Sequence, residues 1–274
     1  MKTLVTHKFP HLDDITAIWL WQKYVPGFKK AKVGFVELAG GGKAVTWKNK
    51  PVDSDREVIH FGVGRGKFDE HKGDIGKSAT LLVHEYLLKQ KLIPNKDKPA
   101  LAKLIEFVNL QDNGKILGLQ YGNMFIPRVL RNIYPSEKRH AIGAELLDAA
   151  LPLYDNEALI EKDWAKSIEF ETRWGKGLAI ETNADGPDAV AYNKGFSLVI
   201  HLDPKRKWRM FRANADSDTD LTGIYEELHR MEPRASWFLH HSKHMLLCGS
   251  RSAPDVVRSR LSLKELVKIA RGKL

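Results

Sequence analysis

The sequence predicts an α/β fold, with a mostly parallel sheet flanked by helices and a second, smaller α+β domain at the C-terminus. Over residues 1–152, short β-prone runs alternate with helical stretches, a pattern typical of parallel sheets. From residue 178 onward, short β-prone runs follow one another more closely, which favours a separate sheet. We therefore predict domains at residues 1–152 and 178–274, joined by a connecting helix within residues 153–177.

Hydrophobic spacing places the elements of the first domain. Apolar runs predict strands near residues 4–5, 32–38 and 58–61, and amphipathic stretches predict helices at residues 15–24, 78–90, 99–110 and 137–151. Residues 155–173 also carry apolar side chains at roughly helical spacing. This spacing favours the connecting helix.

In the second domain, β-prone runs predict a series of short strands. They lie at residues 178–182, 189–192, 196–202, 208–213, 236–240 and 245–247. A terminal helix is expected from residue 262. The sequence contains no internal repeat and no low-complexity tract.

Composition and length set the broad class of protein. A chain of 274 residues with 43% hydrophobic content is long enough to bury a sizeable core. The single cysteine, Cys248, excludes an internal disulfide and fits a reducing compartment. The chain shows neither a signal-peptide pattern nor a run approaching ~18 apolar residues. We expect a soluble, cytoplasmic protein that has no membrane partner.

The charge of the chain indicates an anionic partner. The formal net charge is +10, and residues 205–212 alternate cations with aromatic side chains. Cations neutralise phosphates and aromatic faces stack on bases, so this stretch fits a groove for single-stranded nucleic acid. It equally fits a solvated hairpin with a basic outer face.

Metal-binding side chains follow three apolar segments. His7, His11, Asp13 and Asp14 come after the first predicted strand, and Asp112 follows the predicted helix at residues 99–110. The strand at residues 58–61 contains His60 and leads into Asp69-Glu70-His71. Ligands of open α/β sheets bind beyond the carboxyl ends of the strands. We therefore expect chemistry at these positions.

The order of these residues resembles the DHH phosphoesterase superfamily, and within it the melanocyte-proliferating-gene (Myg) type exonucleases. The first family motif, His-x3-Asp-x-Asp, is similar to His7-x3-His11-x-Asp13. The second, an Asp before Gly at a strand end, is similar to His60-Phe61-Gly62.

The third and fourth motifs continue the resemblance. Asp-His-His is similar to Asp69-Glu70-His71, and an Asp after an apolar helix is similar to Asp112-Asn113-Gly114, which resembles the Myg form closely. All four motifs stand in the family's order within the first 114 residues.

Three departures from the family pattern affect the expected metal. His11 and His60 stand where the family has aspartates, and Glu70 stands where it has the first His. Each is still a possible ligand, but an imidazole cannot bridge two metals as a carboxylate does. The site is thus expected to hold one metal, or two bridged by hydroxide or Glu70, or to have lost activity. The added nitrogen shifts preference from Mg²⁺ to Mn²⁺, with Fe or Zn²⁺ as alternatives.

The resemblance also implies roles for individual residues. One ligand group would contain His7, His11 and His60. A second would contain Asp13, Glu70 and Asp112, with His60 as a further candidate. His71 would contact the scissile phosphate, with Asp13 and Asp112 as further catalytic residues. A substrate-binding role is implied for a set of C-terminal residues, namely His240, His241, Ser242, Lys243, Ser250 and Arg251.

The function implied by the resemblance is a metal-dependent phosphodiesterase or exonuclease acting on short or single-stranded nucleic acid. Two alternatives stay open. The substituted motifs favour a catalytically silent protein of the same fold that binds nucleic acid or a phosphorylated ligand. The breadth of the superfamily also allows a small-molecule phosphatase or pyrophosphatase. The sequence does not indicate an oligomeric state.

Overall fold

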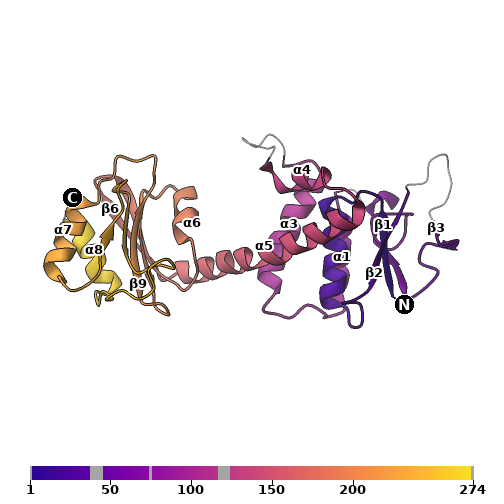
Figure 1. Ribbon diagram of the computed structural model, residues 1–274, viewed down its shortest axis with the longest axis horizontal. Coiled ribbons are helices and arrows are strands. Elements are labelled where there is room, and N and C mark those ends of the chain that lie inside the picture. The colour runs from indigo at the N-terminus through magenta and orange to yellow at the C-terminus, as the bar shows by residue number, and fades with distance from the viewer. Residues whose placement is uncertain (1, 38–45, 74–75, 117–123, 273–274) are drawn as a thin grey trace. The chain divides into compact units, whose positions relative to one another are not determined.

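Two compact units make up the chain, Met1–Asp155 and Asn156–Leu274 (Figure 1). The computed structural model describes residues 2–37, 46–73, 76–116 and 124–272. Each unit has its own sheet and its own hydrophobic core. The predicted fold class, a parallel α/β domain followed by a second α+β domain, is confirmed.

A three-stranded parallel sheet forms the centre of the first unit. Strand β1 (Thr3–His7) lies between β2 (Lys32–Val36) and β5 (Val58–His60). Its first four residues are buried, as expected for a central parallel strand covered on both faces. The three predicted strands are confirmed, although residue 38 of the second lies outside the described residues.

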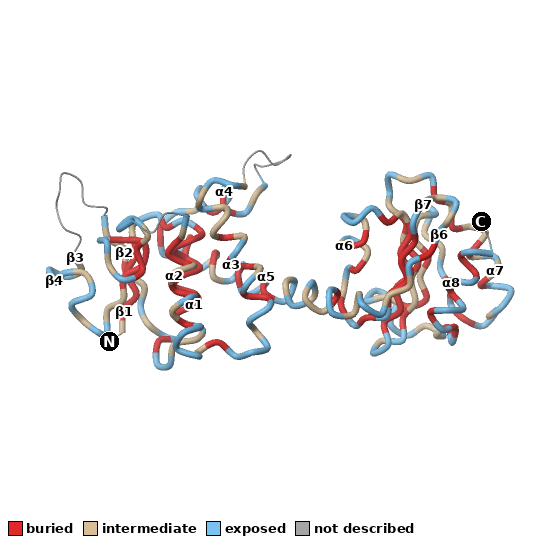
Figure 2. Tube along the Cα trace, turned by 180° about the vertical axis from the view of Figure 1, so that it is seen from behind, coloured by how far each residue is buried: buried red, intermediate tan, exposed pale blue. Residues whose placement is uncertain are grey.

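Helices α1 (Leu12–Tyr24), α2 (Ala79–Lys89) and α3 (Lys98–Asp112) lie beyond one face of this sheet (Figure 2). Residues 12–21 of α1 are all buried. A helix buried on every side belongs at the centre of a core. Its neighbours α2 and α3 pack against it and against each other, and all three helices were predicted.

A short hairpin covers the other face of the sheet. It consists of β3 (Thr46–Trp47) and β4 (Lys50–Pro51). The Trp47 ring packs on Gly34 of β2, where an added Cβ would lie 2.3 Å from the ring. Gly34 is therefore the residue that lets the hairpin approach the sheet. The first unit also contains η1 (Glu70–Lys72) and α4 (Ile126–Arg131).

Helix α5 (Ser136–Trp164) is longer than predicted. It continues through the expected boundary at residue 152 and ends before β6 (Ile168–Thr172). The predicted connecting helix over residues 153–177 is therefore wrong beyond Trp164. In β6, buried Phe170 alternates with exposed Glu169 and Glu171, and this period of two is that of a strand.

A six-stranded mixed sheet forms the second unit, in the order β10-β11-β9-β8-β7-β6. Strands β7 (Gly175–Glu181) and β8 (Leu198–Asp203) are parallel, whereas β9 (Trp208–Ala213), β10 (Phe238–Leu239) and β11 (Met245–Cys248) pair antiparallel. All six residues of β8 are buried, and Figure 2 shows the buried residues concentrated in this sheet. Helices cover both faces of it (Figure 1).

The helices of the second unit differ from the prediction at two places. Residues 189–192, expected as a strand, belong to α6 (Pro187–Asn193), which begins at a proline suited to a first helical turn. Helix α7 (Thr222–Met231) was not predicted, although buried Ile224 and Leu228 have helical spacing. The terminal helix, α8 (Leu263–Gly272), was predicted. No helix of the described residues combines the length and hydrophobicity needed to cross a membrane.

Buried His140 of α5 predicts acid sensitivity. Burial lowers its pKa to about 4, so between pH 6.5 and 4 the unfolded chain binds a proton that the folded chain does not. Stability therefore falls as the pH falls. Between pH 7 and pH 5, the free energy of unfolding of the wild type should fall because His140 is buried. In His140→Leu this fall should be smaller by up to about 2 kcal/mol.

Urea denaturation at both pH values measures this effect. His241→Leu provides the control, because it replaces an exposed imidazole by the same apolar side chain. An unaltered acid limb in His140→Leu would contradict the prediction.

Candidate metal centre

Two adjacent aspartates, Asp13 and Asp14, occupy the first turn of α1 and are both buried. Successive residues of an α-helix point about 100° apart. Because of this divergence, the two side chains serve two different groups of residues. Asp14 faces the end of β1, and Asp13 faces the start of α2.

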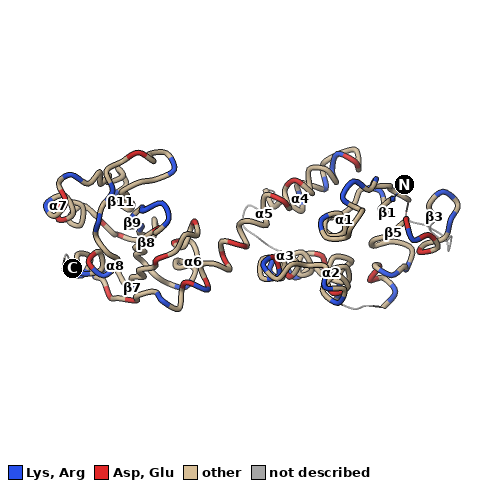
Figure 3. Tube along the Cα trace, turned by 90° about the horizontal axis from the view of Figure 1, so that it is seen from below, with Lys and Arg blue, Asp and Glu red and all other residues tan. Residues whose placement is uncertain are grey.

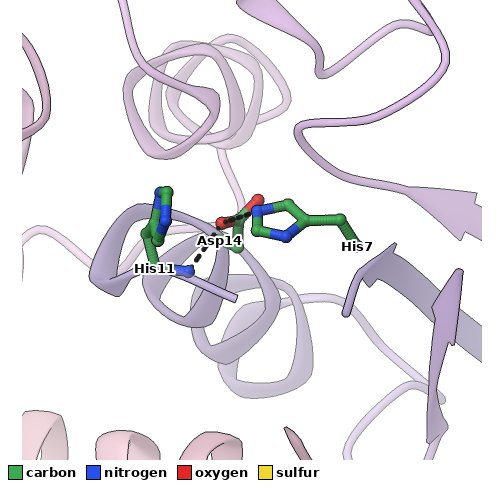
Figure 4. A group of neighbouring side chains, drawn as sticks. All are labelled: His7, His11 and Asp14. Carbon is green, nitrogen blue, oxygen red and sulfur yellow. Dashed lines mark hydrogen bonds and ion pairs between the residues drawn. The ribbon is translucent and has the colours of Figure 1, made fainter. Parts of the chain in front are cut away.

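Asp14 joins the end of β1 to the start of α1 (Figure 4). Its Oδ2 lies 2.9 Å from His7 Nε2 and accepts the backbone N–H of His11 at 2.9 Å. Its Oδ1 accepts the Thr6 hydroxyl at 3.0 Å. Donor atoms of His7, His11 and Asp14 all lie within 4.8 Å of one another, so the three can hold one cation.

The contact between His7 and Asp14 requires a positive charge. Burial disfavours charge on His7, but its hydrogen bond and its attraction to Asp14 together raise the His7 pKa to about 9. The same partner keeps the pKa of Asp14 below its usual range in spite of burial. His7 Nδ1 lies 2.7 Å from the Lys8 carbonyl, which fixes the ring as an outer carbonyl does for metal-bound histidines.

Asp13 caps the start of α2. Its two carboxylate oxygens accept the backbone N–H groups of Ala79 and Thr80, each at 2.9 Å. Such a carboxylate at a helix N-terminus is normally stabilised in its charged form. Here burial, reinforced by the charges of Asp14 and Asp112, raises the Asp13 pKa to about 8. Burial and the neighbouring negative charges therefore outweigh the effect of the helix on the Asp13 pKa.

Glu70 and Asp112 complete this second group. Donor atoms of Asp13, Glu70 and Asp112 lie within 4.8 Å of one another. Burial raises the pKa of Glu70 to about 7, and burial together with the Asp14 charge raises that of Asp112. Glu70 Oε2 is buried and has no hydrogen-bond partner among the described residues. A divalent cation fits this group because it would neutralise the carboxylates and give Glu70 a partner.

His71 stands beside the second group. Its side chain is 71% exposed, and its Nδ1 lies 2.8 Å from Asp69 Oδ1. That hydrogen bond is the main reason why the His71 pKa is raised. Buried Asp69 also accepts the backbone N–H of Arg65. Asp69 therefore fixes both the loop and the His71 ring.

His60 does not join either group. Both of its ring nitrogens are buried without a hydrogen-bond partner among the described residues, and its nearest ion-pair atom is Asp53 Oδ1 at 3.9 Å. The register of β5 against β1 explains why His60 lies outside both groups. Val5 pairs with His60, so the position opposite His7 lies two residues further on, at Gly62.

Gly62 packs directly against the metal centre. A Cβ added there would lie 2.3 Å from Asp14 Oδ1, and its φ of +60° favours glycine. The strand position that faces the site therefore has no side chain. His60 was expected to be the third ligand beside His7 and His11. In the structure, Asp14 supplies that third donor.

The predicted substrate-binding residues all lie in the second unit. His240 Nδ1 is 2.8 Å from the Ser242 hydroxyl, and Lys243 pairs with Asp220 at 2.9 Å. The rings of His240 and His241 lie 4.0 Å apart. Ser250 lies in a surface turn that pairs it with Ala253, and Arg251 pairs with Asp185. Their role toward a substrate stays a prediction.

The basic and aromatic stretch at residues 205–212 is not a base-stacking groove. Phe211 is fully buried and Trp208 is 8% exposed, so neither ring faces solvent. Arg206 and Arg212 form ion pairs with aspartates of the same unit. In Figure 3, Lys and Arg occur over both units rather than along this stretch alone.

Comparisons with known proteins give distant structural likenesses only. No family model and no curated protein match the sequence. An uncharacterized protein from Helicobacter pylori G27 is similar over 100% of both chains, at 13% identity and a TM-score of 0.28. A structure described as the DHH domain of a member of a family of ribosomal proteins is similar at 12% identity and a TM-score of 0.37, over 99% of this chain and 86% of that one.

We expect Asp112→Asn to separate metal binding from folding. Because the fold raises the Asp112 pKa, its charge destabilises the metal-free protein at pH 7, and removing it should leave the melting temperature equal or higher. Metal at a hundredfold excess over Kd should stabilise the wild type by about 2.7 kcal/mol. The variant should lose most of that gain.

Thermal melts with and without Mn²⁺ measure both effects. A metal-free Asp112→Asn protein that melts below the wild type would show that Asp112 supports the fold instead.

Unlike Asp112→Asn, the substitution Asp14→Asn should destabilise the metal-free protein. The change leaves a buried imidazolium without its carboxylate, and removing one partner of a buried pair costs about 2–4 kcal/mol of unfolding free energy. Urea denaturation of the metal-free protein at pH 7 measures the loss. Stability equal to that of the wild type would contradict the role assigned to Asp14.

Proposed function

We propose that this chain is a metal-dependent phosphodiesterase acting on short or single-stranded nucleic acid. One observation carries the proposal. A His-His-Asp group and a carboxylate group meet at two adjacent residues, Asp13 and Asp14, and each group has its donors within 4.8 Å. Adjoining cation sites of this kind suit the charge that develops on a phosphoryl group during its transfer.

The donor chemistry favours Mn²⁺. The group of Asp13, Glu70 and Asp112 offers oxygen alone, which suits Mg²⁺, Ca²⁺ or Mn²⁺. The group of His7, His11 and Asp14 adds two imidazoles, which suit Mn²⁺, Fe or Zn²⁺. Mn²⁺ is common to both sets. A bound divalent cation supplies two things, polarisation of the phosphoryl oxygens and a water of lowered pKa.

Other residues of the chain would transfer protons, contact the phosphate and hold the site in place. His71 is exposed and held by Asp69, so its free Nε2 can donate a proton to the departing oxygen or contact the scissile phosphate. Asp112, whose pKa is raised by burial and by Asp14, can accept a proton from the attacking water. Asp13 holds the start of α2 in place while offering its remaining lone pairs to the site.

Charge and motif order support nucleic acid as the substrate. The net charge of +10 favours a polyanion. The Asp112-Asn113-Gly114 segment resembles that of Myg-type exonucleases. The loop at residues 240–243, with two histidines and a lysine, is our choice for a substrate-binding segment of the second unit.

A metal-free binding protein is the second candidate. It is favoured by Gly62, which leaves no side chain at the strand end facing Asp14, and by the His7–Asp14 ion pair, in which a proton can take the place of a cation. Under this alternative, single strands bind in a salt-dependent way that does not require metal.

Hydrolysis of end-labelled RNA and DNA oligonucleotides with Mn²⁺ tests the proposal. We expect Asp112→Asn and Glu70→Gln to lower the rate by about 100-fold or more, since even outer-shell partners of a metal are worth 10- to 100-fold. Asp55→Asn is the matched control, because Asp55 lies in the same unit and pairs with Lys50.

The results separate the candidates. Equal cleavage by the wild type and by both site variants would overturn the assignment. Oligonucleotide binding that withstands EDTA, with no cleavage, would favour the metal-free binder. Hydrolysis of pyrophosphate alone would identify a small-molecule phosphatase.

A further inference from the structure

Two exposed aromatic rings form a small platform on the first unit. Phe9 is 45% exposed and Tyr134 is 61% exposed. Although far apart in the sequence, their ring centroids lie 5.3 Å apart at 67°. The pair presents aromatic surface to solvent from two separate loops.

Buried Arg139 of α5 supports both rings. Its guanidinium carbon lies 5.4 Å from the Phe9 centroid and 5.3 Å from that of Tyr134. The side chain is only 3% exposed. Its three nitrogens donate to the carbonyls of residues 10 and 133, which lie in the two loops that carry the rings, and of residue 131 at the end of α4. The platform is therefore held in place without any ligand.

The backbone of Phe9 also departs from the usual conformation. Its φ is +58°, in the left-handed region that bulky side chains rarely adopt. Its N–H donates to the Ser136 hydroxyl at 2.9 Å, which helps to hold the turn. Strained residues of this kind gather at functional sites, because the surrounding structure must maintain them. Here the strain keeps an aromatic ring at the surface.

The platform lies beside the metal centre. Phe9 is two residues from His7 and two from His11, both of which belong to the first donor group. Arg131 is exposed, its backbone carbonyl accepts the Arg139 guanidinium that contacts both rings, and its side chain forms no ion pair with the described residues. A cation is thus available for a phosphate next to an aromatic surface.

We propose that a nucleobase of the substrate stacks on Tyr134 while Phe9 contacts the base from the side, and that Arg131 contacts the phosphate attached to that nucleoside. This inference rests on the proposed function and narrows it to phosphodiesters that carry a base. Stacking is sequence-tolerant because every base has a π-face. The platform therefore selects nucleic acid over pyrophosphate or sugar phosphates without selecting a sequence.

Calorimetric titration with 5′-AMP, ribose 5-phosphate and inorganic phosphate tests the platform without hydrolysis. We expect the wild type to bind AMP about 5- to 100-fold more tightly than ribose 5-phosphate, which is the range that one stacked base provides. Tyr134→Ala should remove that preference and leave ribose 5-phosphate binding unchanged. Tyr134→Phe should restore it, because the ring is retained.

A second variant and a control complete the design. Phe9→Ala should also reduce the preference for AMP. Leu153→Ala removes an equally exposed side chain that lies fourteen residues further along α5 than Arg139, about 21 Å away, and should change nothing. Arg131→Gln should weaken AMP and ribose 5-phosphate equally.

The outcomes distinguish the platform from the proposed activity. Equal wild-type affinity for AMP and ribose 5-phosphate, or an unchanged preference in Tyr134→Ala, overturns the platform even if oligonucleotides are cleaved. A base preference that depends on Tyr134 in a protein that cleaves no phosphodiester supports the platform and removes the proposed activity. Where cleavage is observed, Tyr134→Ala should raise KM for a dinucleotide about 5- to 100-fold with little change in kcat.

Discussion

The divergence of Asp13 and Asp14 across the first turn of α1 is the constraint on which the rest of the centre depends. Through Asp14, the helix is joined to the end of β1, and through Asp13 it is joined to the start of α2. Because both side chains are buried, neither can relax into water. The ends of β1, α1 and α2 are therefore fixed relative to one another. The donor atoms that they carry are fixed as a result.

The four carboxylates of the centre differ in how well hydrogen bonds and positive charges balance their negative charge. Asp14 has an imidazolium, a hydroxyl and a backbone N–H, and its pKa is lowered. Asp13 has two backbone N–H groups, yet its pKa is raised to about 8. Glu70 retains a buried oxygen without a partner among the described residues. The pKa values of Asp13, Glu70 and Asp112 are all raised, whereas that of Asp14 is lowered, so a divalent cation would gain most at the carboxylate group.

Much of the fold followed from local patterns in the sequence. The three parallel strands and the first three helices were predicted because their apolar spacing is strong. The second group of ligands, Asp13, Glu70 and Asp112, was anticipated from motif order, and the structure brings these residues together.

Other features depend on register and on tertiary context. Asp14 was not assigned a role, because the helix was expected to begin at Ile15 and not at Leu12. The N3 acid of a capping box was the available signal. The register of β5 against β1 is set by long-range pairing, so the sequence could not show that Gly62, and not His60, faces the site. The Phe9–Tyr134 contact joins loops more than 120 residues apart, a proximity that local patterns cannot reveal.

The first unit alone contains the donor groups, the aromatic platform and the exposed Arg131. Arg139 and Asp14 connect the two loops to α1 and α5. A nucleotide bound with its base on Phe9 and Tyr134 would therefore place its phosphate close to residues held by the same elements. Positioning of the reacting phosphate then does not require the second unit. We propose that the loop at residues 240–243 of that unit binds longer substrates, so its substitutions should change affinity for them more than the chemical step on a dinucleotide.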